Sequence, residues 1–553
     1  MSRFTLCSLI CILLLIAGGA AHGQVLTYSA TGGSGSSSYW NNNWTGAAGL
    51  VVLTTSANDL IINSNGTGTA RNIGSVQLRA NQSANSLTFA FGAAQTTDFV
   101  VRANTATAAY LFNLTLTSGN ITRMADASNT NILVGQTTST SPGRVALLTT
   151  SGGFTFTNHD NNDLVFQSII SGEGKTVTKE GTGTVIFQQA VDYTGAVASD
   201  NTYTGLTTVN AGILDLQKTA GVNAIAGDVL VNAGGTLRLS AADQIANTAG
   251  LTVNGGTVNL QSNNETVSEV TLSGGNIAGD GTLTGSSYAV QSGSVNAKLG
   301  GAAGLTKTTI GTVTLGANNS YSGRTTISAG KLALSSGGSI AQSTVIDVDS
   351  SAVFDVSGVV GYTLANGQTI KGSGTVEGDL TIGDGSVIAP GNSPETLHQI
   401  GTQTWANGGT YLWEINSLTG SAGSDPGWDL MSITGGLNIT ATSDIKFTLQ
   451  VDSLGALAGW DNTGTSEWKI ASATAGITNF ALEKFNIDAS AFVDENPFSS
   501  NGILSLELRN GGTELWMRYA VVPEPSVLGL LGMGLAALWF RCKTRKMNGV
   551  RLE

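Results

Sequence analysis

Residues able to act as nucleophiles, general bases or metal ligands are scarce in this chain of 553 residues. Its three histidines, His22, His159 and His398, are isolated and far apart in the sequence. A zinc site needs three or four nearby ligands, so none is predicted, and no Gly-x-Ser-x-Gly motif with a matching histidine occurs. His159 and Asp160 look the most reactive, but they lie in the run Asn158–Asp163, which is typical of a polar turn.

Acidic residues beside glycine turns are the remaining candidates for catalysis. Glu377, Asp379 and Asp384 lie close together in the sequence. A polysaccharide lyase or glycosidase on a β-helix scaffold would need two such carboxylates within about 10 Å of each other in a groove. Asp280 and Asp384 each stand between two glycines, which suggests a weakly bound Ca2+, but turns explain both positions better. No other cofactor is predicted.

The composition indicates which elements would position these residues. Glycine supplies 74 residues, charged residues make up 11% of the chain and hydrophobic residues 41%, while only seven prolines occur. So large a hydrophobic share argues against disorder, and a chain rich in Gly, Thr, Asn and Val forms helices poorly. Short strands separated by Gly and Asn turns remain, so we predict an all-β fold.

Two long internal repeats support this prediction. Residues 201–216 and 319–334 match at their Tyr-x-Gly and Ala-Gly positions, and similar strands at 178–185 and 306–313 precede them. The pattern resembles the autotransporter-associated β-strand repeat of bacterial surface proteins, over roughly residues 176–334. The resemblance implies a surface protein built from repeated strands.

A shorter strand–Gly-Gly–strand phrase recurs between the two long repeats. Its second glycine is Gly235, then Gly256, then Gly275, at spacings of 21 and 19 residues. A period of about 20 residues suits one coil of a parallel β-helix, in which each coil hydrogen-bonds to the next and buries apolar residues against it. We therefore predict an elongated right-handed parallel β-helix from about residue 45 to about residue 400.

Residues 1–23 have the three parts of a secretory signal peptide. Arg3 supplies the positive charge of the first part, an apolar run extends from Phe4 to Ile16, and small residues at Ala21 and Gly23 form the cleavage site. We therefore expect export through the Sec translocon and cleavage by signal peptidase. Two of the three cysteines would leave with this segment.

A second processing signal occupies residues 521–553. Pro523, Glu524 and Pro525 precede an apolar run, Val527–Phe540, and a basic cluster follows it. The cluster consists of Arg541, Lys543, Arg545 and Lys546. This order resembles the PEP-CTERM tail of Gram-negative bacteria, which an exosortase-type membrane protease reads. It implies that Pro523, Glu524 and Pro525 form the sorting motif.

The apolar run would then be a short transmembrane helix. Its fourteen residues would span roughly 21 Å as a helix, less than the ~30 Å hydrocarbon core. The basic cluster would act as a membrane stop on the cytoplasmic side. The chain would therefore be held transiently in the inner membrane before release.

Three regions are predicted between the two signals. Residues 24–175 are an N-terminal β-helix region with a cap, where Trp40 and Trp44 either plug the open end or stack on sugars. Residues 176–400 are a β-helix carrying the long repeats. Residues 401–520 are a C-terminal β domain, either a final cap or a small β-sandwich. The boundary near 400 follows the phrase Ala389–Pro394, which often ends the repeat region of similar proteins, and precedes a rise in tryptophan. In those proteins a glycine usually stands at the position of Glu395.

The net charge and the two predicted processing signals together predict the function. Without the two signals the chain keeps 19 basic and 35 acidic residues, a net charge of −16, so no nucleic-acid partner is expected. We expect a non-enzymatic protein of the cell surface or extracellular matrix, with exopolysaccharide as a partner. The alternatives are the lyase or glycosidase and, third, an autotransporter passenger.

Overall fold

The computed structural model describes residues 25–28, 37–39, 44–45, 59–63, 75–78, 80–91, 95, 97–103, 110–126, 128–136, 143–189 and 199–522. Residues 1–23, Trp40 and the residues from Pro523 onward lie outside the described residues. The chain divides into two compact units, Met1–Gly301 and Ala302–Glu553. The regular secondary structure of each unit is almost entirely β-strand, which confirms the all-β prediction.

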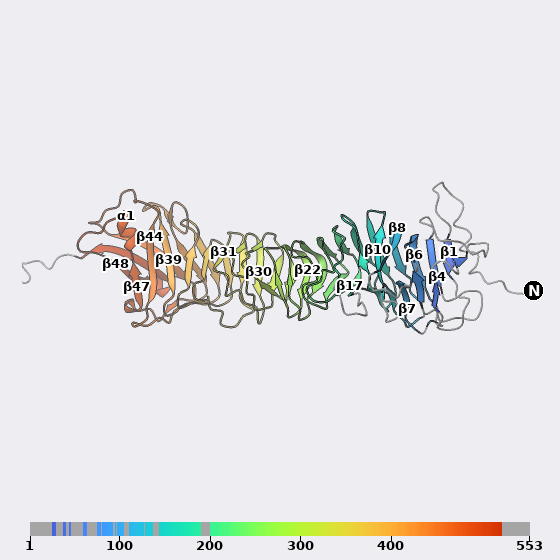
Figure 1. Ribbon diagram of the computed structural model, residues 1–553. Coiled ribbons are helices and arrows are strands. Elements are labelled where there is room, and N and C mark those ends of the chain that lie inside the picture. Colours follow the sequence, from blue (N-terminus) through green and yellow to red (C-terminus); the bar gives the residue numbers. More distant parts are fainter. Residues whose placement is uncertain are drawn as a thin grey trace, which may run out of the picture. The chain divides into compact units, whose positions relative to one another are not determined.

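The first unit contains two long ladders of parallel strands and one short ladder (Figure 1). The first ladder runs, in order of pairing, through β1 (Val25–Tyr28), β4 (Asp59–Asn63), β6 (Gln82–Ala90), β8 (Leu111–Arg123), β11 (Gly153–Asn158), β14 (Thr176–Glu180), β16 (Thr207–Val209), β18 (Val229–Asn232), β20 (Leu251–Asn259), β22 (Glu269–Ala278) and β24 (Ser287–Val290).

The second ladder runs through β2 (Ser37–Tyr39), β5 (Ser75–Leu78), β7 (Phe99–Ala103), β9 (Ile132–Val134), β12 (Leu164–Phe166), β15 (Thr184–Gln188), β17 (Gly212–Gln217), β19 (Gly235–Leu239), the later halves of β20 and β22, and β25 (Gly293–Val295). The short ladder consists of β21 (Glu265–Thr266), β23 (Thr282–Thr284) and β26 (Lys298–Gly300). Beside β8 lie β10 (Arg144–Thr149) and its partner β13 (Ile169–Ile170), and β3 (Trp44–Thr45) is antiparallel to β1.

The three short glycine phrases lie on neighbouring strands, as their period predicts. A side-chain carbon built on Gly256 would come within 2.8 Å of the Gly235 carbonyl oxygen, and one built on Gly275 within 2.1 Å of the Gly256 carbonyl oxygen. Gly275 also has a φ of +89°, a conformation that residues with a side chain rarely adopt. Glycine therefore recurs here because the backbones of successive strands touch.

Alternating burial places the apolar side chains of each strand inside. In β19, Gly235, Leu237 and Leu239 are buried, whereas Thr236 and Arg238 are half-buried. Outward-facing amides stack along the strands: Asn254 donates to Asn232 (3.0 Å) and Asn232 donates to Asn210 (2.8 Å). Asn210 in turn donates to the Glu180 carboxylate at 2.6 Å. A carboxylate thus accepts the last amide hydrogen of the row.

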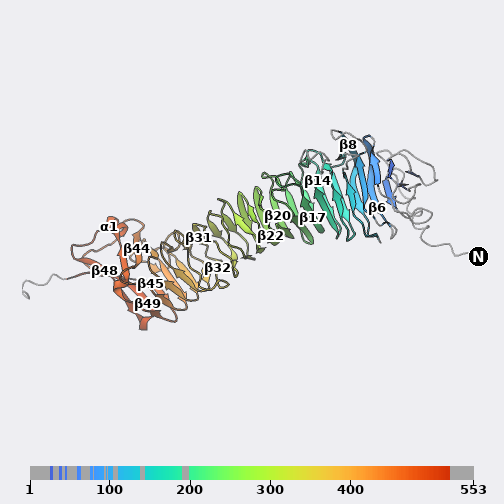
Figure 2. The same ribbon diagram turned by 60° about the horizontal axis from the view of Figure 1, so that its bottom comes forward.

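The second unit repeats the plan with three ladders of parallel strands (Figure 2). One consists of β27 (Leu305–Lys307), β29 (Thr325–Ile327), β31 (Val345–Val348), β33 (Thr369–Gly372), β36 (Val387–Pro390), β39 (Thr410–Ile415), β44 (Phe447–Ser453) and β47 (Phe485–Asp488).

The second of these consists of β28 (Thr312–Leu315), β30 (Gly330–Leu334), β32 (Ala352–Asp355), β34 (Thr375–Glu377), β37 (Thr396–Ile400), β42 (Leu430–Thr434) and β45 (Ser466–Ala473). The third consists of β35 (Leu380–Ile382), β38 (Gln403–Trp405), β43 (Leu437–Ile439) and β46 (Ile477–Thr478).

Residues after 400 continue these ladders and then change to antiparallel pairing. The hairpin of β48 (Gly502–Arg509) and β49 (Glu514–Val521) joins β45 in antiparallel register. A short insertion, β40 (Ser421–Ala422) and β41 (Gly427–Trp428), lies between β39 and β42. Parallel pairing therefore crosses residue 400, and the domain boundary predicted there stays a prediction.

The tryptophans that follow residue 400 supply an aromatic interior. Trp405, Trp413 and Trp468 are buried, and Trp405 stacks on Phe447 with ring centres 4.7 Å apart. The helical elements are short: α1 (Ser490–Glu495), η2 (Leu482–Lys484) and η3 (Asn510–Gly512). Among the described residues, no helix has the length and apolar character needed to cross a membrane. The predicted transmembrane segment, residues 527–540, lies outside the described part of the chain.

Candidate functional site

The two long repeats share a buried lysine that sequence reasoning did not single out. Lys179 and Lys307 are both 0% exposed. The Lys179 ammonium donates to the carbonyl oxygens of Glu180 (2.9 Å), Gly181 (2.8 Å) and Ala211 (2.8 Å). Lys307 donates to the Ala329 carbonyl oxygen at 3.0 Å and to that of Thr309. Burial lowers the pKa of both lysines, that of Lys179 to about 8.

The repeat tyrosines are buried in the same way. The Tyr203 hydroxyl hydrogen-bonds to that of Thr207 at 2.9 Å, and Tyr321 matches it with Thr325 at 2.8 Å. Burial raises the pKa of Tyr203. The lysine and tyrosine of each repeat are therefore sealed from solvent and serve the fold. The matching Thr-Lys pairs at 178–179 and 306–307 were the available signal for this network.

The three carboxylates predicted as catalytic candidates, Glu377, Asp379 and Asp384, each have a different partner. Glu377 pairs with Lys331 at 2.5 Å, and Lys331 also pairs with Asp355 at 3.1 Å. Asp379 accepts the backbone N–H of Thr402 at 2.7 Å. Asp384 accepts from the side-chain amide of Asn366 at 3.4 Å. Within the described residues, no hydrogen bond joins any two of Glu377, Asp379 and Asp384.

The polar run at 158–163 is built around a buried ion pair. Asp160 accepts from the guanidinium of Arg123 at 3.0 Å, and Arg123 is 0% exposed. Burial by itself would raise the pKa of Asp160, but backbone hydrogen bonds from Asp126 and Asn162 and the Arg123 charge bring it below its usual range. His159 beside it is exposed. Asp160 therefore orders this turn.

Metal ligands do not gather in the described part of the chain. No group of three His, Cys, Asp or Glu side chains there is placed to hold a metal ion. Asp280 is exposed, and Asp384 holds Asn366 as described above. The weak Ca2+ site stays a prediction without a ligand set.

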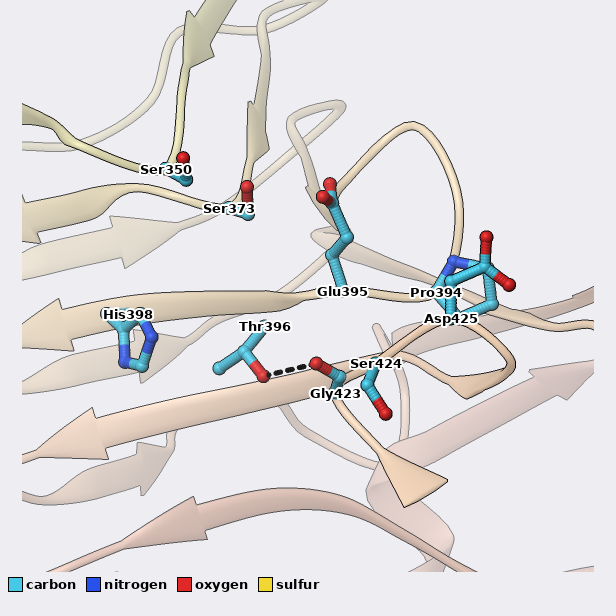
Figure 3. A pocket seen from close by; sticks show the side chains of 9 residues that line it. All are labelled: Ser350, Ser373, Pro394, Glu395, Thr396, His398, Gly423, Ser424 and Asp425. Carbon is cyan, nitrogen blue, oxygen red and sulfur yellow. Dashed lines mark hydrogen bonds between the residues drawn. The ribbon is translucent and has the colours of Figure 1, made fainter. Parts of the chain in front are cut away.

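One hollow of the second unit gathers polar side chains (Figure 3). We call it the corner hollow; its volume is about 380 Å3 and its lining consists of Ser350, Ser373, Pro394, Glu395, Thr396, His398, Gly423, Ser424 and Asp425. Ser350 follows β31 and Ser373 follows β33, so small residues at the same turn of successive strands leave the space. The insertion around β40 and β41 supplies residues 423–425.

Hydrogen bonds hold the wall of the corner hollow in place. The Thr396 hydroxyl donates to the Gly423 carbonyl oxygen at 3.0 Å, which fixes the insertion against β37 (Figure 3). The backbone N–H of Glu395 donates to Asp429 at 3.0 Å. Burial, together with the charges of Glu414 and Glu395, raises the pKa of Asp429 to about 8, against the opposing effect of two backbone hydrogen bonds.

The resemblance led us to expect glycine at the position of Glu395, and the structure shows how the turn forms without it. The left-handed conformation is taken by Gly391, with φ +72°, four residues earlier. Glu395 precedes β37 and needs no such conformation. Its half-buried side chain therefore becomes available to the corner hollow.

The first unit has a hollow of its own. Its volume is about 330 Å3, and its lining is Leu206, Asp228, Val229, Leu230, Gly250, Leu251, Thr252, Glu269 and Thr271. Asp228 accepts the backbone N–H of Gly250 at 2.7 Å. The lining is more apolar than that of the corner hollow, since three leucines and a valine take part.

Two known family models match parts of this chain. A model of the passenger-associated-transport-repeat matches residues 177–216 and 305–334. A model of the PEP-CTERM protein-sorting motif matches residues 521–546. The chain carries both motifs. The two resemblances inferred from the sequence are thus confirmed, and they indicate an exported protein of the cell surface or extracellular space.

One relative shares sequence beyond these motifs. The adhesin BmaC autotransporter of Brucella suis biovar 1 (strain 1330) is 28% identical over 320 residues. The match covers 52% of this chain and 8% of the adhesin. The chain therefore spans a small fraction of that protein's length.

Proposed function

We propose that this chain is a non-enzymatic surface or exopolysaccharide-matrix protein, a β-helical rod that an exosortase-type protease sorts. The observation that carries the proposal is the joint presence of two passenger-associated-transport-repeats and a PEP-CTERM motif in one chain. The known adhesin to which it is similar supports an adhesive role at the surface.

The parallel ladders of each unit support the β-helical part of the proposal. Strands that pair in parallel and recur about every 20 residues are what stacked coils require. The proposed coils are right-handed, and the proposed regions are 24–175, 176–400 and 401–520, the last being a final cap or a small β-sandwich. An experimental density map with antiparallel central strands or left-handed coils would contradict this.

Processing at both ends completes the proposal. Signal peptidase removes residues 1–23 after passage through the Sec translocon. Residues 527–540 then hold the chain in the inner membrane, with Arg541, Lys543, Arg545 and Lys546 on the cytoplasmic side, until the exosortase cuts near Pro523–Pro525. Mass spectrometry of the mature protein tests this. We expect a last residue close to Val522, and extracellular peptides containing residues 541–546 would contradict it.

The second candidate, a polysaccharide lyase or glycosidase, has one observation in its favour. Glu395 and Asp425 border the same hollow together with His398, and paired carboxylates are the usual means of glycoside cleavage. Incubation of the purified protein with neutral and acidic polysaccharides decides between the two. We expect no shortening of the polymers; shortening that Glu395→Gln abolishes would establish the enzyme instead.

A further inference from the structure

We propose that the corner hollow binds hexosamine residues with a free amino group in an exopolysaccharide. This inference rests on the proposed matrix function and names the sugar class and its site. Clefts that bind small ligands have volumes of about 300–1,000 Å3. The corner hollow, at about 380 Å3, lies at the lower end of that range, which suits one or two sugar rings.

The lining favours a ligand rich in hydroxyl groups. Ser350, Ser373 and Ser424 bring hydroxyls, and His398 brings an imidazole on an exposed position of β37. Hydroxyl and imidazole groups can both donate and accept hydrogen bonds, as sugar hydroxyls do. The lining contains no Phe, Tyr or Trp on which a sugar ring could stack, so polar contacts would have to fix the ligand.

Charge selects among sugars. Glu395 and Asp425 contribute carboxylates, and the lining includes no lysine or arginine. Asp425 uses one oxygen to accept from Asn416 at 2.7 Å, which orients the carboxylate. No side-chain partner for the Glu395 carboxylate occurs among the described residues. Both carboxylates would attract an ammonium group, whereas a uronic acid would be repelled.

Binding of short sugars to the purified exported chain tests this inference. Calorimetry would compare tetramers of glucosamine, N-acetylglucosamine and galacturonic acid. We expect binding of the glucosamine tetramer alone, because acetylation removes the ammonium charge and uronic acid reverses it. The double variant Glu395→Gln/Asp425→Asn should weaken that binding about tenfold or more, since two carboxylate–ammonium contacts are lost.

A matched variant controls for the acidity of the whole protein. Asp444→Asn/Asp494→Asn removes the same charge from two exposed positions of the same unit and should leave binding unchanged. Equal thermal unfolding of both double variants would show that the fold is kept. The inference would be overturned by equal binding of the acetylated tetramer, by equal binding of tetralysine, by no binding of glucosamine, or by equal effects of the two double variants.

These outcomes are separable from the proposed function. A chain found outside the cell that fails to bind the glucosamine tetramer refutes the sugar site alone. A chain that binds the tetramer but never leaves the cell refutes the proposed function alone. Shortening of the bound tetramer would support the site and refute the non-catalytic role.

Discussion

Lys179 is the clearest example of one residue that the fold depends on. Its buried ammonium is the shared donor for three carbonyl groups, those of the half-buried residues Glu180, Gly181 and Ala211. We expect Lys179→Met to lower the free energy of unfolding by about 2–4 kcal/mol, because three carbonyl groups lose their donor and this loss outweighs the relief of a buried charge. Urea unfolding followed by circular dichroism would measure it.

Lys298→Met is the matched control for this prediction. Lys298 is exposed in the same unit, so its substitution should change the free energy of unfolding by no more than about 0.5 kcal/mol. If both substitutions gave the same urea midpoint, the buried network would be irrelevant to stability. The burial of Lys179 was not predictable from the sequence, since a lysine between threonines on a short strand is more often solvated.

Glu265 makes stability depend on pH. It is 1% exposed and accepts backbone N–H groups of Gln244 (2.8 Å) and Ile245 (3.3 Å). Burial raises its pKa from 4.5 to about 7, although these hydrogen bonds oppose the change. Between these values the unfolded chain loses its proton first, so the contribution of Glu265 to stability is complete below pH 4.5 and is lost as pH rises through 7.

Glu265→Gln should remove this part of the pH dependence. The wild type should lose up to about 3 kcal/mol relative to the variant between pH 4.5 and pH 8. Thermal unfolding at a series of pH values would measure the difference between the two curves. Glu269→Gln, at an exposed position, should leave the wild-type curve unchanged. Parallel curves for wild type and Glu265→Gln would refute the assignment.

At the scale of elements, the glycine turns determine how closely neighbouring strands approach. Gly275→Ala would place a methyl group 2.1 Å from the Gly256 carbonyl oxygen, far inside van der Waals contact, at a φ of +89°. We expect a loss of about 2 kcal/mol or more, from strain and from separation of β20 and β22. Urea unfolding and limited proteolysis between residues 250 and 280 would report it.

Gly152 provides the comparison for Gly275. A side-chain carbon there would meet no atom within 4 Å, and its φ is not left-handed. Gly152→Ala should therefore be neutral or slightly stabilising, because alanine restricts the unfolded chain. Equal losses for the two substitutions would mean that backbone contact does not explain the repeated glycines.

Sequence reasoning identified these elements because the pattern is local. The strand–Gly-Gly–strand phrase repeats its own backbone requirement, so Gly235, Gly256 and Gly275 indicated neighbouring strands before any contact was known. The corner hollow was beyond such reasoning. Glu395 and Asp425 lie thirty residues apart, and only the insertion at β40 and β41 brings Asp425 to the turn before β37. Residues that only long-range contacts bring together show no repeating pattern in the sequence.

At the scale of the whole molecule, different parts of the chain determine its fold and its sorting. The repeats form strands that pair with their neighbours, while residues 521–546 match a protein-sorting motif. The last described strand, β49, ends at Val521, two residues before Pro523. A cut near the sorting motif would therefore leave every described strand in the released protein.

The sorting motif can be substituted without changing any residue of the described strands. We expect Pro523→Ala/Glu524→Ala/Pro525→Ala to keep the chain in the inner-membrane fraction, because the exosortase would no longer recognise it while residues 527–540 still anchor it. Cell fractionation followed by immunoblotting would measure a shift of most of the protein from the extracellular to the membrane fraction, with a mass larger by the uncut tail. Deletion of residues 523–553 is the comparison: lacking motif and anchor alike, that chain should leave the membrane. Release of the triple-alanine variant at the wild-type rate and mass would show that Pro523, Glu524 and Pro525 do not direct the cut.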